Sequence, residues 1–155
     1  MMCGVAGSGK TTYAKQLAAD GFVRLSIDEE VWLRFGRHGI DFDPADYEQL
    51  SAKAEAELRK RLVELIHDGQ SVVLDMSFWR RATRDSYKAL IVEAGGRWQL
   101  TYLKAEKELL RTRLKERAER YDANAAFPVT DELLERFLSG FEEPVGEGET
   151  IVEVT

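Results

Sequence analysis

With 155 residues, the chain is long enough for one compact domain with a sizeable core and short for two. Hydrophobic residues make up 44% and charged residues 32%, as in an ordinary soluble globular protein, and no apolar run approaches the ~20 residues of a membrane-spanning helix. The formal net charge of −6 argues against a protein that binds extended nucleic acid over a broad surface.

Residues typical of disulfides and zinc sites are scarce. Cys3 is the only cysteine, which rules out a disulfide within the chain and fits a reducing compartment. His38 and His67 are the only histidines, so a dedicated zinc site has few ligands to use. A glycine-rich loop begins almost at the amino end, so we expect no signal peptide and a cytoplasmic location.

Residues 4–11 read Gly-Val-Ala-Gly-Ser-Gly-Lys-Thr, a complete match to the G-x-x-x-x-G-K-[ST] phosphate-binding loop. Glycines allow the tight turn that directs backbone N–H groups inward, and a helix predicted from about Lys10 to Ala19 adds a favourable dipole. Lys10 is expected to contact the β- and γ-phosphates, and the Thr11 hydroxyl to bind Mg²⁺. The predicted phosphate-binding residues are Gly4, Gly7, Ser8, Gly9, Lys10, Thr11 and Thr12. The motif predicts a nucleoside triphosphate site.

Strands and helices are predicted to alternate along the rest of the chain. Only residues 1–3 precede the loop, so the first strand is either very short or cut by the start of the sequence. Further strands are predicted at 22–27, 71–74, 98–103 and 150–154, and helices at 31–35, 44–68, 81–94, 106–117 and 130–138. This alternation implies right-handed crossovers and a mostly parallel sheet covered on both faces, so residues 1–155 are predicted to form one α/β domain.

Two aspartates follow predicted strands, at the sheet edge where ligands of such folds collect. Asp28 is placed to accept a proton from an acceptor hydroxyl, or it is simply the N-cap of the next helix. Asp75 could orient a Mg²⁺-bound water, or cap the following turn. Met76 stands where hydrolases of this class commonly carry a water-activating acid, which favours phosphoryl transfer over hydrolysis.

Basic residues near the predicted site have two interpretations each. Arg113 and Arg117 lie four residues apart on one helix face, where bidentate guanidinium groups could bind a transferring phosphate or could be solvated beside glutamates. Arg80, Arg81 and Arg84 begin another predicted helix and could hold an anionic acceptor, although a surface turn is slightly favoured. Four aromatic residues could line an acceptor pocket, although core positions are favoured; they are Trp32, Phe35, Phe78 and Trp79. Tyr47 is interpreted as core, and His38, in a glycine-containing loop, is a weak candidate for substrate contact.

The combination of motifs resembles the P-loop kinases. The resemblance rests on the loop at 4–12, Gly21-Phe22 leading to Asp28, the run 72–75, and the pair Arg113 and Arg117. The pattern is similar to the 5′-kinase domain of phage polynucleotide kinase, to small bacterial AAA-family predicted kinases, to zeta toxins and to chloramphenicol phosphotransferase. The segments 77–81, 127–130 and 141–144 resemble the bacterial group. In polynucleotide kinases an arginine follows the base aspartate; Val31 stands at that position here, which argues against a nucleic-acid 5′ end as acceptor.

The resemblance implies a nucleotide-kinase-like P-loop NTPase fold: a three-layer sandwich with a parallel five-stranded sheet in the order 2-3-1-4-5 and a helical lid at about 118–130. It implies ATP and Mg²⁺ as cofactors, Asp28 as general base, Lys10, Arg113 and Arg117 as catalytic cations, and Thr11 with Asp75 at the metal. The predicted function is a kinase acting on a hydroxyl of a small molecule, a nucleotide or a nucleic-acid end. An ATP-binding switch without an acceptor and a toxin-like kinase acting on a nucleotide sugar remain alternatives.

Overall fold

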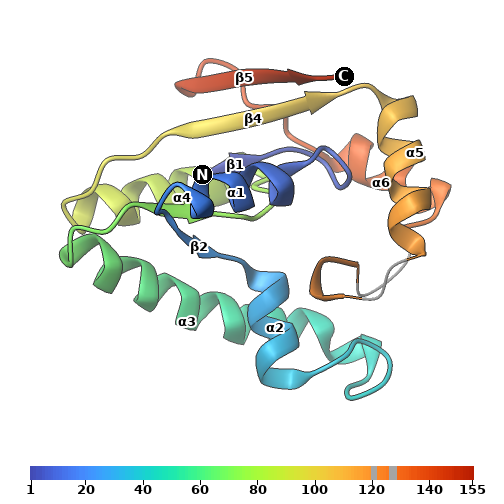
Figure 1. The fold of residues 1–155 in the computed structure, drawn as a ribbon, viewed down its shortest axis with the longest axis horizontal. Coiled ribbons are helices and arrows are strands. Elements are labelled where there is room, and N and C mark those ends of the chain that lie inside the picture. Colours follow the sequence, from blue (N-terminus) through green and yellow to red (C-terminus); the bar gives the residue numbers. More distant parts are fainter. Residues whose placement is uncertain (120–121, 126–128) are drawn as a thin grey trace.

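The computed structural model describes residues 1–119, 122–125 and 129–155. Strands and helices alternate along the chain, as the sequence predicts (Figure 1). The elements are β1 (Met2–Cys3), α1 (Lys10–Ala19), β2 (Val23–Leu25), α2 (Ile27–Phe35), α3 (Tyr47–His67), β3 (Val72–Leu74), α4 (Arg81–Glu93), β4 (Leu100–Ala105), α5 (Lys107–Ala118), α6 (Asp131–Gly140) and β5 (Glu149–Val154). Short 3₁₀ turns occupy Pro44–Asp46 and Ala123–Ala125. The predicted lid at 118–130 falls partly outside the described residues.

All paired strands are parallel, but the predicted continuous five-stranded order 2-3-1-4-5 is wrong. The described strands form a three-stranded sheet in the order β1-β4-β5 and a separate pair, β2-β3. The reason is the length of β1, which has two residues and then leaves the strand direction at Gly4. Where a β3–β1 ladder would continue, the Gly4 N–H donates one hydrogen bond of 3.1 Å to the Ser77 carbonyl.

Helices cover both sides of the strands. On one side Ala14 of α1 packs with Met2, Val73 and Leu103 of three different strands. On the other side lies the larger core, to which α3 and α4 contribute Leu58, Leu62, Tyr87 and Ile91. In Figure 1, β5 forms the outer edge of the three-stranded sheet, and α5 and α6 lie together at one end of the molecule. The fold is therefore the expected α/β arrangement with helices on both faces.

Local sequence explains most of the element boundaries. Helix α1 has the predicted bounds, and α3 buries the predicted apolar stripe through Ala54, Leu58, Leu62 and Leu65. Strand β2 is shorter than predicted because the Ser26 side chain caps α2, accepting a hydrogen bond from the Glu29 N–H, so the chain is already helical at Ile27. Within the described ranges, no helix combines the length and apolarity needed to cross a membrane.

Arg84 lies in the interior, so its placement in a surface turn is wrong. Its side chain is 0% exposed and donates two hydrogen bonds to Glu147, from Nε to Oε2 at 2.9 Å and from Nη2 to Oε1 at 2.6 Å. Its Nη1 donates to the Phe78 carbonyl at 2.9 Å, which holds that residue at a positive φ of 45°. Arg84 thus fastens α4 to the turn after β3 and to the loop before β5.

Candidate active site

The phosphate-binding loop joins β1 to α1 and packs against α5. Gly4, Gly7 and Gly9 all have positive φ values, of 147°, 86° and 94°. A Cβ at Gly7 would lie 3.2 Å from the Leu110 carbonyl oxygen, so the loop and α5 are in close contact. Gly9 is the N-cap of α1 and no side chain caps this end, so the first-turn N–H groups are available to an anion.

Lys10 begins α1 and turns back over the loop, where its Nζ donates a hydrogen bond of 2.9 Å to the Val5 carbonyl. Burial lowers the pKa of Lys10 to about 8, and the nearby carboxylates of Asp75 and Asp28 oppose this decrease. A phosphate group bound at this point would favour the charged ammonium. Lys10 therefore has the position and the electrostatic environment of a phosphate ligand.

Asp75 directly follows β3 and is held by Arg24, a residue that no sequence motif singles out. Its Oδ2 accepts hydrogen bonds from Arg24 Nε at 2.9 Å and Nη2 at 2.6 Å, while Arg24 Nη1 donates to Glu29 at 2.5 Å. Its other oxygen, Oδ1, accepts from the Thr11 hydroxyl at 3.4 Å. The signal for Arg24 was a charged side chain inside a predicted apolar strand, since it lies in β2 opposite Val73.

The donors at this point fit Mg²⁺. Thr11 Oγ1 and Asp75 Oδ1 are neighbouring oxygen atoms, the ligand type that this ion prefers. In the described part of the chain, no three or more His, Cys, Asp or Glu residues form a metal-binding group. Mg²⁺ bound with substrate phosphates usually takes only one or two protein carboxylates and keeps several waters. A pair of oxygen donors beside a phosphate-binding loop matches that mode.

Asp28 is the second residue of α2; it is neither at a strand end nor the helix N-cap, since Ser26 has that role. Its side chain is open to the cleft, and its Oδ1 accepts a hydrogen bond of 3.1 Å from the Tyr47 hydroxyl. The cleft walls reduce the hydration of the Asp28 carboxylate, which raises its pKa, while the Tyr47 hydrogen bond and the charge of Arg117 oppose this increase. Tyr47, interpreted from the sequence as core, therefore touches the candidate base.

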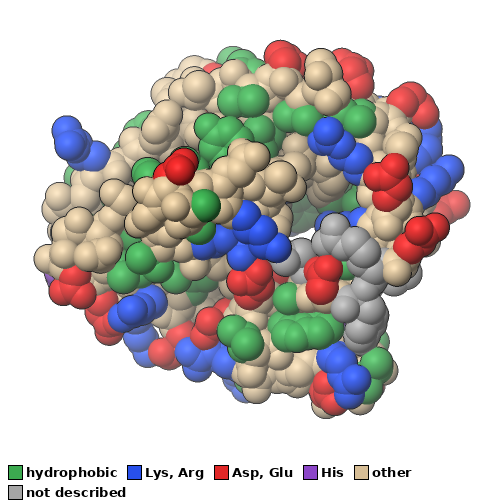
Figure 2. Space-filling model, in the orientation of Figure 1, with side chains coloured by type: hydrophobic (Ala, Val, Ile, Leu, Met, Phe, Trp, Pro, Cys, Tyr) green, Lys and Arg blue, Asp and Glu red, His purple; other side chains and the backbone are tan. Residues whose placement is uncertain are grey.

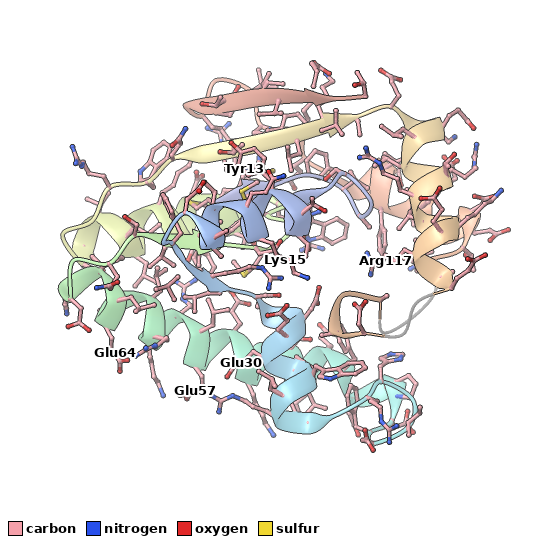
Figure 3. All side chains as sticks on the ribbon, in the orientation of Figure 1. Tyr13, Lys15, Glu30, Glu57, Glu64 and Arg117 are labelled. Carbon is pink, nitrogen blue, oxygen red and sulfur yellow. The ribbon has the colours of Figure 1, made fainter. Side chains whose placement is uncertain are left out.

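The two predicted arginines extend from α5 toward the same region. A Cβ at Gly9 would lie 3.7 Å from Arg113 Nη1, so this guanidinium lies against the phosphate-binding loop. Arg117 projects from the side of α5 that faces the rest of the molecule (Figure 3), and its charge influences the pKa of both Asp28 and Lys10. Arg111, on the same helix, instead pairs with Glu108 and Asp131.

The predicted phosphate-binding, catalytic and metal residues all line one cleft of about 1470 Å³, whereas Arg80 and Arg81 are not among its described lining residues. The lining residues predicted from the sequence come from the loop, the start of α2, the end of β3 and helix α5, and the surface is hollowed on the inner side of α5 (Figure 2). A smaller pocket of about 50 Å³ adjoins this cleft and shares three of its residues. It is lined by Asp28, Val31, Trp32, Gly36, His38, Phe42, Tyr47, Arg117 and Ala123. The arrangement offers a large space at the loop and a small one beside Asp28.

A comparison with protein families gives a match over residues 1–144 to the family model described as an AAA domain. The chain belongs to this family. A comparison with curated proteins finds no match. The family assignment covers the loop, both aspartates and both α5 arginines, so every predicted site residue lies inside the matched domain.

Solved structures of other proteins share the fold. A gluconokinase from Sinorhizobium meliloti 1021 aligns with a TM-score of 0.64 at 21% identity, over 99% of this chain and 80% of that one. A kinase candidate from Chloroflexus aurantiacus j-10-fl aligns at 0.74 and 20% identity, over 98% and 86%. Chaetomium thermophilum Kti12, solved with ADP-AlF3, aligns at 0.62 and 16% identity, over 98% and 87%. The chain therefore has the α/β fold of small P-loop kinases and related AAA proteins.

Proposed function

We propose that residues 1–155 form a single kinase domain that uses ATP and Mg²⁺ to phosphorylate a hydroxyl group of a small acceptor. The observation that carries this proposal is the shared cleft: a complete phosphate-binding loop and the carboxylate of Asp28, with its raised pKa, line the same space. A carboxylate with an elevated pKa is better matched to accepting a proton than an ordinary one. Met76 after Asp75 provides no second acid for water activation.

On the donor side, the loop N–H groups and Lys10 would hold the triphosphate, and Arg113 would lie along it. When bound, Mg²⁺ would neutralise charge on the β- and γ-phosphates. Thr11 and Asp75 would orient this ion, with Arg24 keeping Asp75 fixed. The kinases among the structural neighbours support this assignment of class. One more of them is a sugar kinase from Janibacter sp. HTCC2649, which aligns with a TM-score of 0.60 at 18% identity, over 98% of this chain and 82% of that one.

On the acceptor side, Asp28 would take the proton. Tyr47 holds its Oδ1, so the acceptor hydroxyl would donate to Oδ2. The acceptor oxygen then forms a bond to the γ-phosphorus while the bond from that phosphorus to the bridging oxygen of ADP breaks. Arg117 would stabilise the charge on the transferring group, since its field already reaches both Asp28 and Lys10.

The test is a screen with γ-labelled ATP and Mg²⁺ against neutral aromatic alcohols, nucleosides, sugars, sugar acids and nucleic-acid 5′ ends. For the acceptor found, Asp28→Asn should reduce kcat by about 10² to 10⁴, the usual contribution of a general base. The affinity of the Asp28→Asn variant for ATP should stay unchanged. The matched control is Glu30→Gln, on the same helix but paired with Arg34 at the surface, which should leave kcat unchanged.

Two results would contradict the proposal. One is an Asp28→Asn variant that transfers phosphate as fast as the unmodified protein, because it would remove Asp28 from the reaction. The other is tight ATP binding without phosphate transfer to any acceptor class, which would favour the switch alternative. Lys10→Ala, expected to lose ATP binding, verifies that any observed transfer starts at the loop.

A further inference from the structure

The turn that follows β3 carries an uncommon backbone conformation. Phe78 has a φ of 45°, and within residues 1–119, 122–125 and 129–155 it is the only residue other than glycine with a positive φ. A bulky side chain in this left-handed region costs free energy, and the conformation persists only where the surroundings hold it. The three residues before Phe78 are Asp75, Met76 and Ser77, which all line the cleft. The candidate site is therefore directly followed in the chain by a strained residue.

Helix α4 holds Phe78 in this conformation. The Phe78 carbonyl accepts a hydrogen bond of 2.9 Å from Arg84 Nη1 and one of 3.4 Å from Cys3 Sγ. The Phe78 ring meets the Tyr87 ring edge to face, with centroids 5.0 Å apart at 89°. Arg84 and Tyr87 lie on one face of α4, because they are three positions apart, and both are fully buried. The same helix face thus fixes both the carbonyl and the ring of Phe78.

This turn also anchors the phosphate-binding loop. The Ser77 carbonyl accepts a hydrogen bond of 3.1 Å from the N–H of Gly4, the first residue of the loop. Among the described strands β1 pairs with β4 and not with β3, so this bond stands where a ladder would otherwise form. The dihedral angles of Phe78 set the angle between the Ser77 and Phe78 carbonyls, because these belong to the rigid peptide groups on its two sides. While Arg84 holds one carbonyl, the other is directed at Gly4.

Stability alone does not explain why a charged pair is buried at this point. Arg84 and Glu147 are 0% and 2% exposed, and their two hydrogen bonds measure 2.9 and 2.6 Å. Apolar side chains can often replace such a pair without loss of stability, because removing both charges from water offsets their attraction. An apolar pair would leave the Phe78 carbonyl without its donor on α4. The guanidinium serves Glu147 and this carbonyl together, because its donors form a rigid planar fork.

We propose that Arg84, oriented by Glu147, is a positioning residue for the candidate active site. Arg84 holds the Phe78 carbonyl and fixes the strained turn, which keeps the start of the phosphate-binding loop in register with Asp75. Neither Arg84 nor Glu147 is among the described residues that line the cleft, so both act through the turn. The inference rests on the proposed function for its ligand, ATP with Mg²⁺, whereas the link from Arg84 to Gly4 belongs to the free protein.

Amide hydrogen exchange followed by NMR measures this link in the free protein. The double variant Arg84→Met/Glu147→Leu removes the guanidinium and keeps the interior filled. The Gly4 amide should exchange about tenfold faster or more in this variant than in the unmodified protein, because the bond to the turn opens more often. The Thr101 amide is the internal reference, because its bond of 2.9 Å to the Met1 carbonyl lies on the β4 side of the loop. Its exchange should change by less than about twofold.

Calorimetric titration with Mg²⁺ and a non-hydrolysable ATP analogue then measures the consequence for the site. The Kd of the double variant should rise about tenfold or more, because the loop is no longer held in register with Asp75. The control is Ile91→Ala, which removes a buried side chain further along α4. This control should lower the melting temperature and leave the Kd unchanged. A stable variant that binds weakly, beside a less stable variant that binds normally, separates positioning from stability.

A second variant keeps the buried charges. Arg84→Lys retains a cation opposite Glu147, but one ammonium group cannot reproduce the planar fork that also reaches the Phe78 carbonyl. Gly4 exchange and the Kd should therefore rise in Arg84→Lys as well. This variant decides the question if the double variant does not fold.

The outcomes separate this inference from the kinase assignment. A Gly4 amide that exchanges at the unmodified rate in the folded Arg84 variants, or an unchanged Kd in them, would overturn the positioning role and leave the kinase function standing. If the unmodified protein binds no ATP analogue, the proposed function is contradicted. Faster Gly4 exchange in the Arg84 variants would then still support the link between Arg84 and the loop.

Discussion

Removing Glu147 should destabilise the whole fold, because it would leave the guanidinium of Arg84 buried without its counter-ion. The two side chains are 0% and 2% exposed and share two hydrogen bonds, and Arg84 also binds the Phe78 carbonyl. Lys88 adds a second positive charge, with its Nζ 3.4 Å from Glu147 Oε2. Glu147→Ala therefore leaves two cations close together, with one of them fully enclosed.

The expected loss is large. Breaking a buried ion pair by deleting one partner costs about 3–5 kcal/mol. In a domain of this size each kcal/mol lowers the melting temperature by about 2–4 °C, so Glu147→Ala should melt about 6–20 °C below the unmodified protein. The exposed pair of Lys60 and Glu57, with side chains 69% and 44% exposed, provides the contrast. Glu57→Ala should leave the melting temperature almost unchanged.

Thermal and urea unfolding followed by circular dichroism measure both variants. The double variant Arg84→Met/Glu147→Leu replaces the pair with apolar side chains of similar size, and it should recover most of the stability lost in Glu147→Ala. A Glu147→Ala protein that melts within about 2 °C of the unmodified chain would refute the reasoning, because an unpaired buried cation should lower the free energy of unfolding by more than that shift allows.

Acidification should weaken the same pair. The hydrogen bonds from Arg84 lower the pKa of Glu147 below its ordinary value of 4.5. A carboxyl group whose pKa is lower in the folded state stabilises the fold above its unfolded pKa, and this contribution is lost as the pH falls through the folded pKa. Below about pH 4.5 the unmodified protein should therefore lose stability more steeply than Glu147→Gln, which has no such carboxylate.

Two further predictions concern the candidate site. Arg24→Lys keeps a positive charge but loses the paired hydrogen bonds to Asp75 Oδ2, so the Mg²⁺ concentration for half-maximal transfer should rise about tenfold or more. The control is Arg34→Lys at the surface, which should leave this Mg²⁺ concentration unchanged. Equal Mg²⁺ requirements in both variants would contradict a role for Arg24 in orienting Asp75. Because the pKa of Asp28 is raised above 3.8 and that of Lys10 is lowered to about 8, kcat/KM should fall on the acid side as Asp28 gains its proton and on the alkaline side as Lys10 loses its own. Lys10→Arg should remove the alkaline decline, and an identical pH profile in that variant would exclude Lys10 as its source.

The phosphate-binding loop and the alternation of elements were predictable because local rules determine them. The loop motif is contiguous, and its last two residues start a helix with the predicted bounds, Lys10–Ala19. The stripe from Ala54 to Leu65 follows the helical repeat, so one face of α3 had to be buried. In each case the residues that decide the structure lie within a few positions of one another.

The parts that were missed depend on partners far apart in the chain. Arg24 and Asp75 are separated by 51 positions, and Arg84 and Glu147 by 63. A charged residue at the start of a predicted helix looks the same whether it faces water or a buried carboxylate, and only the folded chain brings Glu147 to Arg84. Asp28 was misplaced by two residues for a local reason, since Ser26 is the better-positioned cap.

The same cleft holds two carboxylates, and their neighbours give them different chemistry. Asp75 is joined to the guanidinium of Arg24 by paired hydrogen bonds, which hold it with its second oxygen toward Thr11, as a metal-orienting group requires. Asp28 is joined to the neutral hydroxyl of Tyr47, and reduced hydration raises its pKa, as a proton acceptor requires. Carboxylates whose environments differ in this way divide the acid–base and electrostatic roles of a site between them. If Asp28 is the base, giving it a cationic partner like that of Asp75 should therefore impair transfer even with both carboxylates present. Tyr47→Lys supplies such a partner and lowers the pKa of Asp28, so kcat at neutral pH should fall. Tyr47→Phe removes a hydrogen bond that opposes the raised pKa, so it should not reduce kcat by lowering the pKa of Asp28.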